Sequence, residues 1–272
     1  MHPFRVWLTA FVVMALCVSC YTPKTAPNSG RIHLSAQAGD QPGIEGALQS
    51  GANVNQIDNQ GRTPLIFATE GNKTATVEYL LTKGADPNAI ADDGSTPLLI
   101  TVRKGNPRMA QLLIEKGARL DSFGDDGFTA LTVAAEKGNR NVFELLLQSG
   151  AKPDVSIANR DTALMKSILR RDSFFFDRLI EAGADPNKKG RDGNTPLIVA
   201  ACANKLEITE KLLHRGARID DVNDKGYSAL LFAAGLQGIK PDIARLLLEK
   251  GAAVNQPSKD GLTPMKAACQ AG

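Results

Sequence analysis

Two pairs of neighbouring carboxylates are the side chains in this sequence that most resemble catalytic or metal-binding groups. Asp92-Asp93 and Asp125-Asp126 could supply a general acid and a general base, or oxygen ligands for calcium. Each pair is followed directly by glycine, and Asp-Gly is a typical turn sequence, because Asp bonds to nearby backbone and glycine tolerates a positive φ. The pairs therefore indicate turns, and we expect no catalytic residue among them.

Histidine is too scarce to build a catalytic or metal centre. The three histidines are His2, His33 and His214, and neither a metal cage nor a Ser-His-Asp arrangement can be assembled convincingly from them. His33 is predicted to be structural and locally hydrogen-bonded, since no second histidine or cysteine accompanies it. The sequence therefore predicts a protein that is not an enzyme, with no metal, no cofactor and no small-molecule substrate.

The composition describes a folded chain without a strong electrostatic field. The 272 residues are 43% hydrophobic and 22% charged, which excludes a charged, natively unfolded protein. The 32 basic and 29 acidic residues leave a net charge of +3, too small to suggest binding to nucleic acid or to an anionic membrane surface. Phe, Tyr and Trp number only 10, 3 and 1, so one large aromatic-rich core is not expected.

The first 20 residues have the pattern of an export signal. His2 and Arg5 precede an uncharged, mostly apolar run at 6–18, which is short for a membrane-spanning helix and suits the apolar region of a secretory leader. Residues 21–30 contain two prolines among Thr, Asn and Ser and show no periodicity, so they are predicted to be a linker. The sequence therefore predicts a signal peptide at 1–20, a linker at 21–30 and a folded domain at 31–272.

The end of this leader, Leu16-Cys17-Val18-Ser19-Cys20, resembles the lipobox of bacterial lipoproteins. The resemblance implies that Cys20 is lipidated and anchors the chain to a lipid bilayer of the cell envelope, facing the periplasm. Cys17 departs from the pattern, because an aliphatic residue is usual there. A plain signal peptide cut nearby, which would leave a soluble periplasmic protein, and an uncleaved anchor remain the alternatives.

Two short motifs recur in step through the rest of the chain. A Gly-Ala pair and a triplet similar to Thr-Pro-Leu each occur seven times, with 33 residues between successive copies and 35 in the last interval. The Gly-Ala pairs begin at Gly51, Gly84, Gly117, Gly150, Gly183, Gly216 and Gly251, and the triplets begin at Thr63, Thr96, Thr129, Thr162, Thr195, Ser228 and Thr263. A fixed period of this length is typical of repeat architectures.

Each unit is predicted to form a helix, a turn, a second helix and an extended loop. Thr can cap a helix whose first position is occupied by Pro, as at Thr63-Pro64. In the unit at 129–148, a first helix at 129–137 is expected to end at Gly138, and a second helix is expected at 141–148. The predicted buried residues of the second helix are Val142, Leu145, Leu146 and Leu147.

The segments TPLIFA, TPLLIT and TPLIVA, each followed by Leu-Leu and by GADPN-like sequences, resemble ankyrin repeats. The resemblance covers 31–272 and implies an all-α ankyrin-repeat solenoid of paired antiparallel helices with β-hairpin-like loops, about seven repeats plus a terminal half repeat. It also implies a non-enzymatic module that binds an unidentified protein partner on its concave face. Such a protein could be anchored, or it could be a soluble periplasmic protein that supports or inhibits one envelope enzyme.

The family's contact positions flank the turn glycine and end the first helix of each unit. Carried over to this chain, they give a predicted protein-binding face of Arg62, Glu70, Asp93, Arg103, Lys104, Asp126, Phe128, Lys137, Asp161, Arg170, Arg191, Asn194, Lys225 and Tyr227. Phe128 and Tyr227 are the aromatic members of this set. Each could be an exposed interface anchor or could fold back over its neighbour, and the sequence leaves both alternatives open.

The unit at 161–193 departs most from the repeat pattern. Arg160 replaces the turn glycine, Arg171 replaces the residue that closes the first helix, and three phenylalanines run together at 174–176. A repacked core is favoured over a basic and aromatic partner site, because adjacent helical residues point to different faces.

Three features of the C-terminal units complete the predictions. A two-residue insertion near 236–241 is predicted to lengthen an interhelix turn. Cys202 and Cys269 lie two repeats apart, so no disulfide joins them, and both are interpreted as small apolar residues. Met265 and the neighbouring alanines are expected to be exposed or covered by a partner, because the last unit has one helix.

Overall fold

The computed structural model describes residues 30–170 and 173–271, which fold into short helices and loops. The helices are α2 (Arg31–Ala38), α3 (Gln41–Gln49), α4 (Pro64–Glu70), α5 (Thr74–Thr82), α6 (Pro97–Lys104), α7 (Pro107–Glu115), α8 (Ala130–Lys137), α9 (Arg140–Gln148), α10 (Ala163–Ile168), α11 (Phe174–Glu181), α12 (Pro196–Cys202), α13 (Leu206–His214), α14 (Ala229–Ala234), α15 (Pro241–Glu249) and α16 (Pro264–Ala271), with a 3-10 turn η1 at Arg191–Gly193. Within the described residues they form seven helix pairs followed by α16. The predicted signal peptide and nearly all of the predicted linker lie outside these residues.

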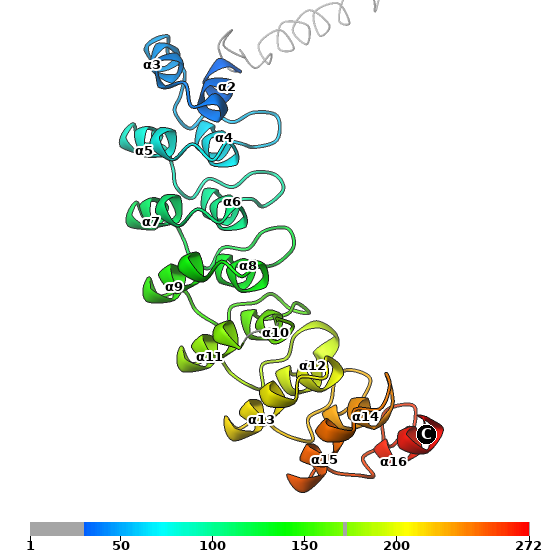
Figure 1. Ribbon diagram of the computed structural model, residues 1–272. Coiled ribbons are helices and arrows are strands. Elements are labelled where there is room, and N and C mark those ends of the chain that lie inside the picture. The colour runs from blue at the N-terminus through cyan, green and yellow to red at the C-terminus, as the bar shows by residue number, and fades with distance from the viewer. Residues whose placement is uncertain (1–29, 171–172, 272) are drawn as a thin grey trace, which may run out of the picture.

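The helix pairs stack into a curved row (Figure 1). The first helices of the pairs, here called inner helices, pack on one another in the order α2, α4, α6, α8, α10, α12, α14 and α16. The second helices, here called outer helices, line the other side, and the long loops project from the side of the inner helices, toward which the row curves (Figure 1). The all-α solenoid predicted from the sequence is confirmed.

The recurring Thr or Ser starts each inner helix from α4 to α14. The side-chain oxygens of Thr63, Thr96, Thr129, Thr162, Thr195 and Ser228 accept a hydrogen bond from the backbone N–H three residues later. For Thr129 the acceptor distance to Thr132 N is 3.3 Å. At the other end of α8, Gly138 has a φ of 80°, a left-handed conformation that favours glycine. The predicted start and end of this helix are confirmed.

The buried face of α9 differs from the prediction. Val142, Phe143 and Leu146 are buried, whereas Leu145 and Leu147 are only half-buried, and the helix begins one residue earlier than expected. Residues i, i+1 and i+4 share one face of a helix, so the inward face passes through Phe143 and leaves the two predicted leucines at its margins. The prediction that Leu145 and Leu147 are buried was therefore wrong.

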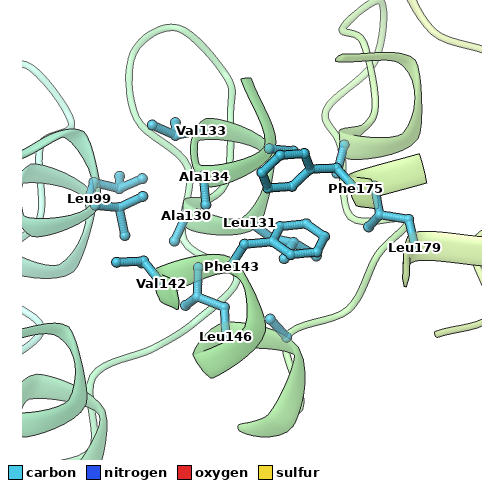
Figure 2. Packing of buried hydrophobic residues seen from close by; sticks show 14 of the residues in the cluster. Leu99, Ala130, Leu131, Val133, Ala134, Val142, Phe143, Leu146, Phe175 and Leu179 are labelled. Atoms are coloured by element: carbon cyan, nitrogen blue, oxygen red, sulfur yellow. The ribbon is translucent and has the colours of Figure 1, made fainter. Parts of the chain in front are cut away.

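Small alanines on the inner helices let each layer approach the next. Figure 2 shows Ala130 and Ala134 of α8 facing the larger side chains of neighbouring elements, including Leu99 of the preceding unit and Phe143 of α9. Phe175 of α11 reaches the same layer, and its ring centre lies 4.9 Å from that of Phe143 in an edge-on arrangement. One continuous core therefore runs from repeat to repeat.

The three phenylalanines at 174–176 are part of this core. Phe175 and Phe176 are each 1% exposed, and Phe174 is half-buried beneath the guanidinium of Arg140, which lies 4.5 Å from its ring centre. Repacking, favoured from the sequence, is confirmed. Arg171 lies outside the described residues.

The turn before this unit lacks the usual glycine and uses a different residue for the left-handed conformation. The turn glycines of the other units have a positive φ, as at Gly127 and Gly193, but at this turn Asn159 takes the left-handed conformation, with a φ of 59°. Asn tolerates this region better than most residues, because its short side chain can bond locally. The left-handed residue is therefore Asn159, one residue before the usual glycine position, and Arg160 does not have to adopt a positive φ.

The insertion at 236–241 forms the turn between α14 and α15, as predicted. Lys240 is 9% exposed, and its ammonium donates to the carbonyl oxygens of Gln237 at 3.2 Å and Gly238 at 3.0 Å. The lysine therefore closes the longer turn on itself.

The terminal units contain two further predicted features. His33 is buried, its Nε2 lies 2.9 Å from the Gln56 carbonyl oxygen, and its ring packs edge-on against Phe67. Its predicted structural role is confirmed. In α16 Met265 is 53% exposed, as expected, whereas Ala267 is buried.

Candidate protein-binding surface

The loop tips and the inner helices form one continuous face of the solenoid. The predicted hairpin-like loops close through backbone bonds, such as those from Asp58 N to Arg62 O and from Ala91 N to Ser95 O, each 3.0 Å long. Neighbouring tips are also joined: Asp92 N donates to Gln60 O at 2.9 Å. The backbone thus holds the predicted contact residues at fixed intervals along one surface.

Arg62 lies in a preformed cluster at the first of these tips. Its guanidinium donates to the Asp58 carboxylate at 2.9 Å, approaches Glu70 at 3.6 Å and lies 4.3 Å from the centre of the Phe67 ring. The structure therefore brings Arg62 and Glu70, two predicted site residues, together. Asp58, which the sequence analysis did not select, completes the cluster.

Arg103 makes the corresponding bridge one unit later. Its guanidinium donates to the carboxylate of Asp126 at 2.9 Å and lies 3.4 Å from the hydroxyl of Ser95. Arg103 lies in the last turn of α6 and Asp126 belongs to the next tip, so the pair ties two repeats together. Both are predicted site residues, and their side chains stay more than one-third exposed.

Phe128 is fixed by a neighbouring lysine. Its half-buried ring packs on the core, and the ammonium of Lys166 on α10 lies 4.5 Å from the ring centre. The same ammonium contacts Glu136 at 3.1 Å and Asp161 at 3.8 Å. Sequence analysis missed Lys166, although a lysine in place of the apolar Ile100 and Val133 of earlier units was a visible signal.

Tyr227 also folds onto its neighbours. Its half-buried ring packs edge-on against Phe232, and its hydroxyl donates to the Asp260 carboxylate at 3.2 Å. Burial and the adjacent carboxylate together raise the pKa of Tyr227. For both aromatic residues the geometry favours the alternative in which the ring covers its neighbour. It does not support the alternative in which Phe128 and Tyr227 are exposed interface anchors.

The remaining predicted residues divide into linking and exposed side chains. Arg170 donates to the Glu136 carbonyl oxygen at 2.8 Å, and the Asn194 side chain accepts from Asn223 at 2.9 Å, so both join successive repeats. Asp161 accepts from Arg191 N at 3.3 Å. Exposed members of the set are Asp93, Lys104, Lys137, Arg191 and Lys225. These five can meet a partner without disturbing the fold.

Sequence analysis missed a row of apolar side chains beside the tips. Ile57, Ile90 and Phe123 occupy the same position in three consecutive units and are 63%, 58% and 36% exposed. Their separation of 33 residues is visible in the sequence. Whether these loop side chains would be buried or exposed could not be predicted from it. The surface therefore offers apolar area as well as charge.

Other kinds of site are not found in the described residues. Nowhere in 30–170 and 173–271 do three or more His, Cys, Asp or Glu side chains gather closely enough to hold a metal ion. In the same residues no helix combines the length and apolar character needed to cross a membrane. Cys202 and Cys269 are free thiols, as predicted. Cys202 is half-buried, whereas Cys269 is exposed on α16, so the small apolar residue expected at 269 is not buried there. Cys20 lies outside the described residues.

Comparison with known proteins agrees with the geometry. The family model described as "Ankyrin repeats (3 copies)" matches residues 26–91, 72–157 and 154–223. The ankyrin repeat domain of Bcl-3, described as a unique member of the IkappaB protein family, has a similar structure, with a TM-score of 0.69 and 23% identity over 80% of this chain and 97% of that chain. The human ASB11 ankyrin repeat domain gives a TM-score of 0.65 and 25% identity over 82% and 98%. No curated protein sequence matches the chain.

Stacked helix pairs with projecting tips define a protein–protein interaction module. The chain belongs to the ankyrin-repeat family. Proteins of this class bind protein partners.

Proposed function

We propose that this protein is an exported, lipid-anchored module that holds a protein partner on the face formed by its tips and inner helices. The observation that carries the proposal is that this face contains both cations fixed by ion pairs and cations that remain exposed. Arg62, Arg103 and Lys166 are held by ion pairs, while Lys104 and Lys137 stay exposed between them. Ordered charges lower the entropy that side chains lose when a partner binds.

Recognition fits this surface better than catalysis does. A catalytic site brings together titratable groups in a recess, with pKa values shifted for proton transfer. Here the carboxylates of the face lie along a row of tips, and Asp58 has a lowered pKa because hydrogen bonds to its charged form outweigh its burial. A carboxylate stabilised as an anion is suited to hold an arginine in place.

The proposed anchor rests on the lipobox-like end of the leader. Cys20 would carry the lipid, and residues 21–30 would form a spacer that can span at most about 35 Å. Such a spacer separates the solenoid from the bilayer, so that the binding face stays accessible. Without lipid, the same domain would be a soluble periplasmic binding protein.

Metabolic labelling with a palmitate analogue tests the anchor. Wild-type protein should take up label, and Cys20→Ala should not. Cys17→Ala is the matched control and should label as strongly as wild type, since the thiol at 17 is removed with the leader. Equal labelling of Cys20→Ala and wild type would contradict lipidation.

Charge reversal tests the binding face. The double variant Lys104→Glu/Lys137→Glu should lose capture of the partner recovered by cross-linking wild-type protein in its native cells, because both lysines face the partner. Lys116→Glu changes another exposed lysine, directly after outer helix α7 and away from this face, and should retain capture. Full capture by the double variant, with an unchanged unfolding midpoint, would place the binding surface elsewhere.

A further inference from the structure

Three exposed apolar side chains form a row along the loops that follow α3, α5 and α7. Ile57, Ile90 and Phe123, here called the apolar tip row, lie 33 residues apart and are 63%, 58% and 36% exposed. Single exposed apolar residues are common on proteins. Here, however, exposed apolar residues recur at one position of consecutive units. Because the units stack, the three side chains form a line.

The loops that carry the middle and last members of this row are acidic. Residues 85–95 contain three Asp and no Lys or Arg, and residues 118–128 contain three Asp and one Arg. Their net charges are therefore −3 and −2. Asp92, Asp93 and Asp125 are exposed, while Asp126 pairs with Arg103. Exposed carboxylates thus border the apolar tip row.

The row has a clear end. In the next unit Ser156 takes the equivalent position, and the neighbouring Ile157, which is 39% exposed, is displaced by one residue from the row and approaches Gly127. One unit further, the position is Lys189, whose ammonium donates to the Val222 carbonyl oxygen at 2.7 Å. Among the described residues, a large exposed apolar residue at this position is therefore confined to the loops that follow α3, α5 and α7.

The spacing of the three side chains favours one secondary structure for the segment that binds them. Packed helices lie about 8–10 Å apart, so equivalent residues of successive units have a similar separation. In an α-helix, residues seven apart lie on one face and about 10.5 Å apart. In an extended strand, residues three apart span about 10 Å but point to opposite faces. A helix laid along the solenoid can therefore place one apolar side chain against each member of the row.

Two other occupants fit less well. A second copy of this chain would bury three side chains on each side, much less than the roughly 1,200 Å² that a stable interface needs. A polyproline segment has a suitable period of about 9.3 Å, but such segments dock in aromatic-lined grooves. The row has one aromatic ring, and a proline-rich segment would leave the bordering carboxylates without partners.

We propose that the apolar tip row and its acidic border bind a basic amphipathic α-helix of the partner protein. Apolar residues of that helix at every seventh position contact Ile57, Ile90 and Phe123. Lysines or arginines beside them face Asp92, Asp93 and Asp125. This inference rests on the proposed function and names the chemistry of the partner.

Peptide binding to the purified domain 31–272 tests the inference, with the family's fold as the reason to expect this domain to be stable alone. The probe is a synthetic helical peptide of about 18 residues, with Leu at every seventh position, Lys on both sides of the Leu stripe and Ala elsewhere. The matched control has the same composition, with the leucines distributed around the helix. A proline-repeat peptide serves as the alternative probe.

The probe should bind, and Ile90→Ser/Phe123→Ser should raise its Kd at least about tenfold, since two apolar contacts are lost. Leu206→Ser/Ile239→Ser removes exposed apolar residues elsewhere and should leave the Kd unchanged. Asp92→Asn/Asp125→Asn should weaken binding most at low salt, because screening removes part of this attraction.

Absence of binding, equal binding of the redistributed peptide, preference for the proline repeat or an unchanged Kd in Ile90→Ser/Phe123→Ser would each overturn the inference. These outcomes are distinct from a failure of the proposed protein-binding function. If Lys104→Glu/Lys137→Glu abolishes capture of the native partner while the peptide results are negative, protein binding stands and only the helical partner is wrong.

Discussion

The carboxylate of Asp58 shows how single residues organise the binding face. It accepts hydrogen bonds from the backbone N–H groups of Gln60 and Arg62 and from Nε and Nη2 of Arg62. Burial alone would raise the pKa of Asp58, but these bonds outweigh it and hold the pKa below its ordinary value. The ionised form is therefore favoured by folding.

We predict that Asp58→Asn lowers the free energy of unfolding by about 1 kcal/mol at pH 7. A carboxylate with a depressed folded-state pKa stabilises the protein above its unfolded pKa of about 3.9, and this stabilisation is lost as the pH falls through the folded value. Urea unfolding from about pH 5 towards pH 3 should therefore show the wild-type advantage shrinking. Asn59→Ala, which alters an exposed neighbour, is the control. An advantage that stays constant with pH would contradict the assignment.

At this scale the sequence predicted positions better than pairings. Arg103 and Asp126 were both selected as contact residues, but they are 23 residues apart, and only the fold places their side chains 2.9 Å from each other. Phe128 was placed at a tip, yet whether its ring would point outward depended on Lys166, which lies one unit later. Contacts between repeats cannot be read from one repeat.

At the scale of the helices, the threonines that start α4, α6, α8, α10 and α12 act as both cap and core residues. Thr129 is 1% exposed, and its hydroxyl accepts from Thr132 N while it also contacts the Thr132 hydroxyl at 3.1 Å. Its removal leaves buried donors without partners.

Thr129→Ala should therefore lower the free energy of unfolding by about 1–2 kcal/mol. Thr129→Ser keeps the hydroxyl and should recover most of this loss. Both variants can be compared by chemical denaturation at one pH. If Ser is as harmful as Ala, the methyl group matters more than the cap.

The phenylalanine layer gives a second prediction at the scale of elements. Phe175 is buried and packs edge-on against Phe143 of the preceding pair, whereas Phe174 is half-buried. Phe175→Ala should cost about 3–5 kcal/mol, and Phe174→Ala distinctly less, in equilibrium unfolding. Equal losses would show that the buried ring is not the main contact between α9 and α11.

Helix order and caps were predictable because each unit repeats the same local signals. The register of the buried face in α9 was not, because three adjacent leucines at 145–147 cannot all point inward and Phe143 takes the inner place. Likewise, the shift of the left-handed turn residue from 160 to Asn159 follows from local strain and leaves no periodic signal.

At the scale of the whole molecule, the main contacts of each helix pair in the described residues are with the adjacent pairs, so stability is distributed along the row. A weak interface should divide such a row into parts that unfold separately. Phe175 lies in the fifth of the seven described pairs. We expect Phe175→Ala to broaden the denaturation curve or divide it into two steps, with hydrogen exchange rising first from α10 onward. A single, equally steep transition would contradict this nearest-neighbour behaviour.

The central claim is that the tips and inner helices bind a protein, and photo-cross-linking in the native cell tests it most directly. A photoreactive amino acid would be placed at Lys104 or Lys137 on the proposed face, and at Gln111 or Gln148 on the outer helices. We predict one discrete cross-linked protein from the first two positions and none from the other two. Equal cross-linking from the outer helices, or none from Lys104 and Lys137, would contradict the account.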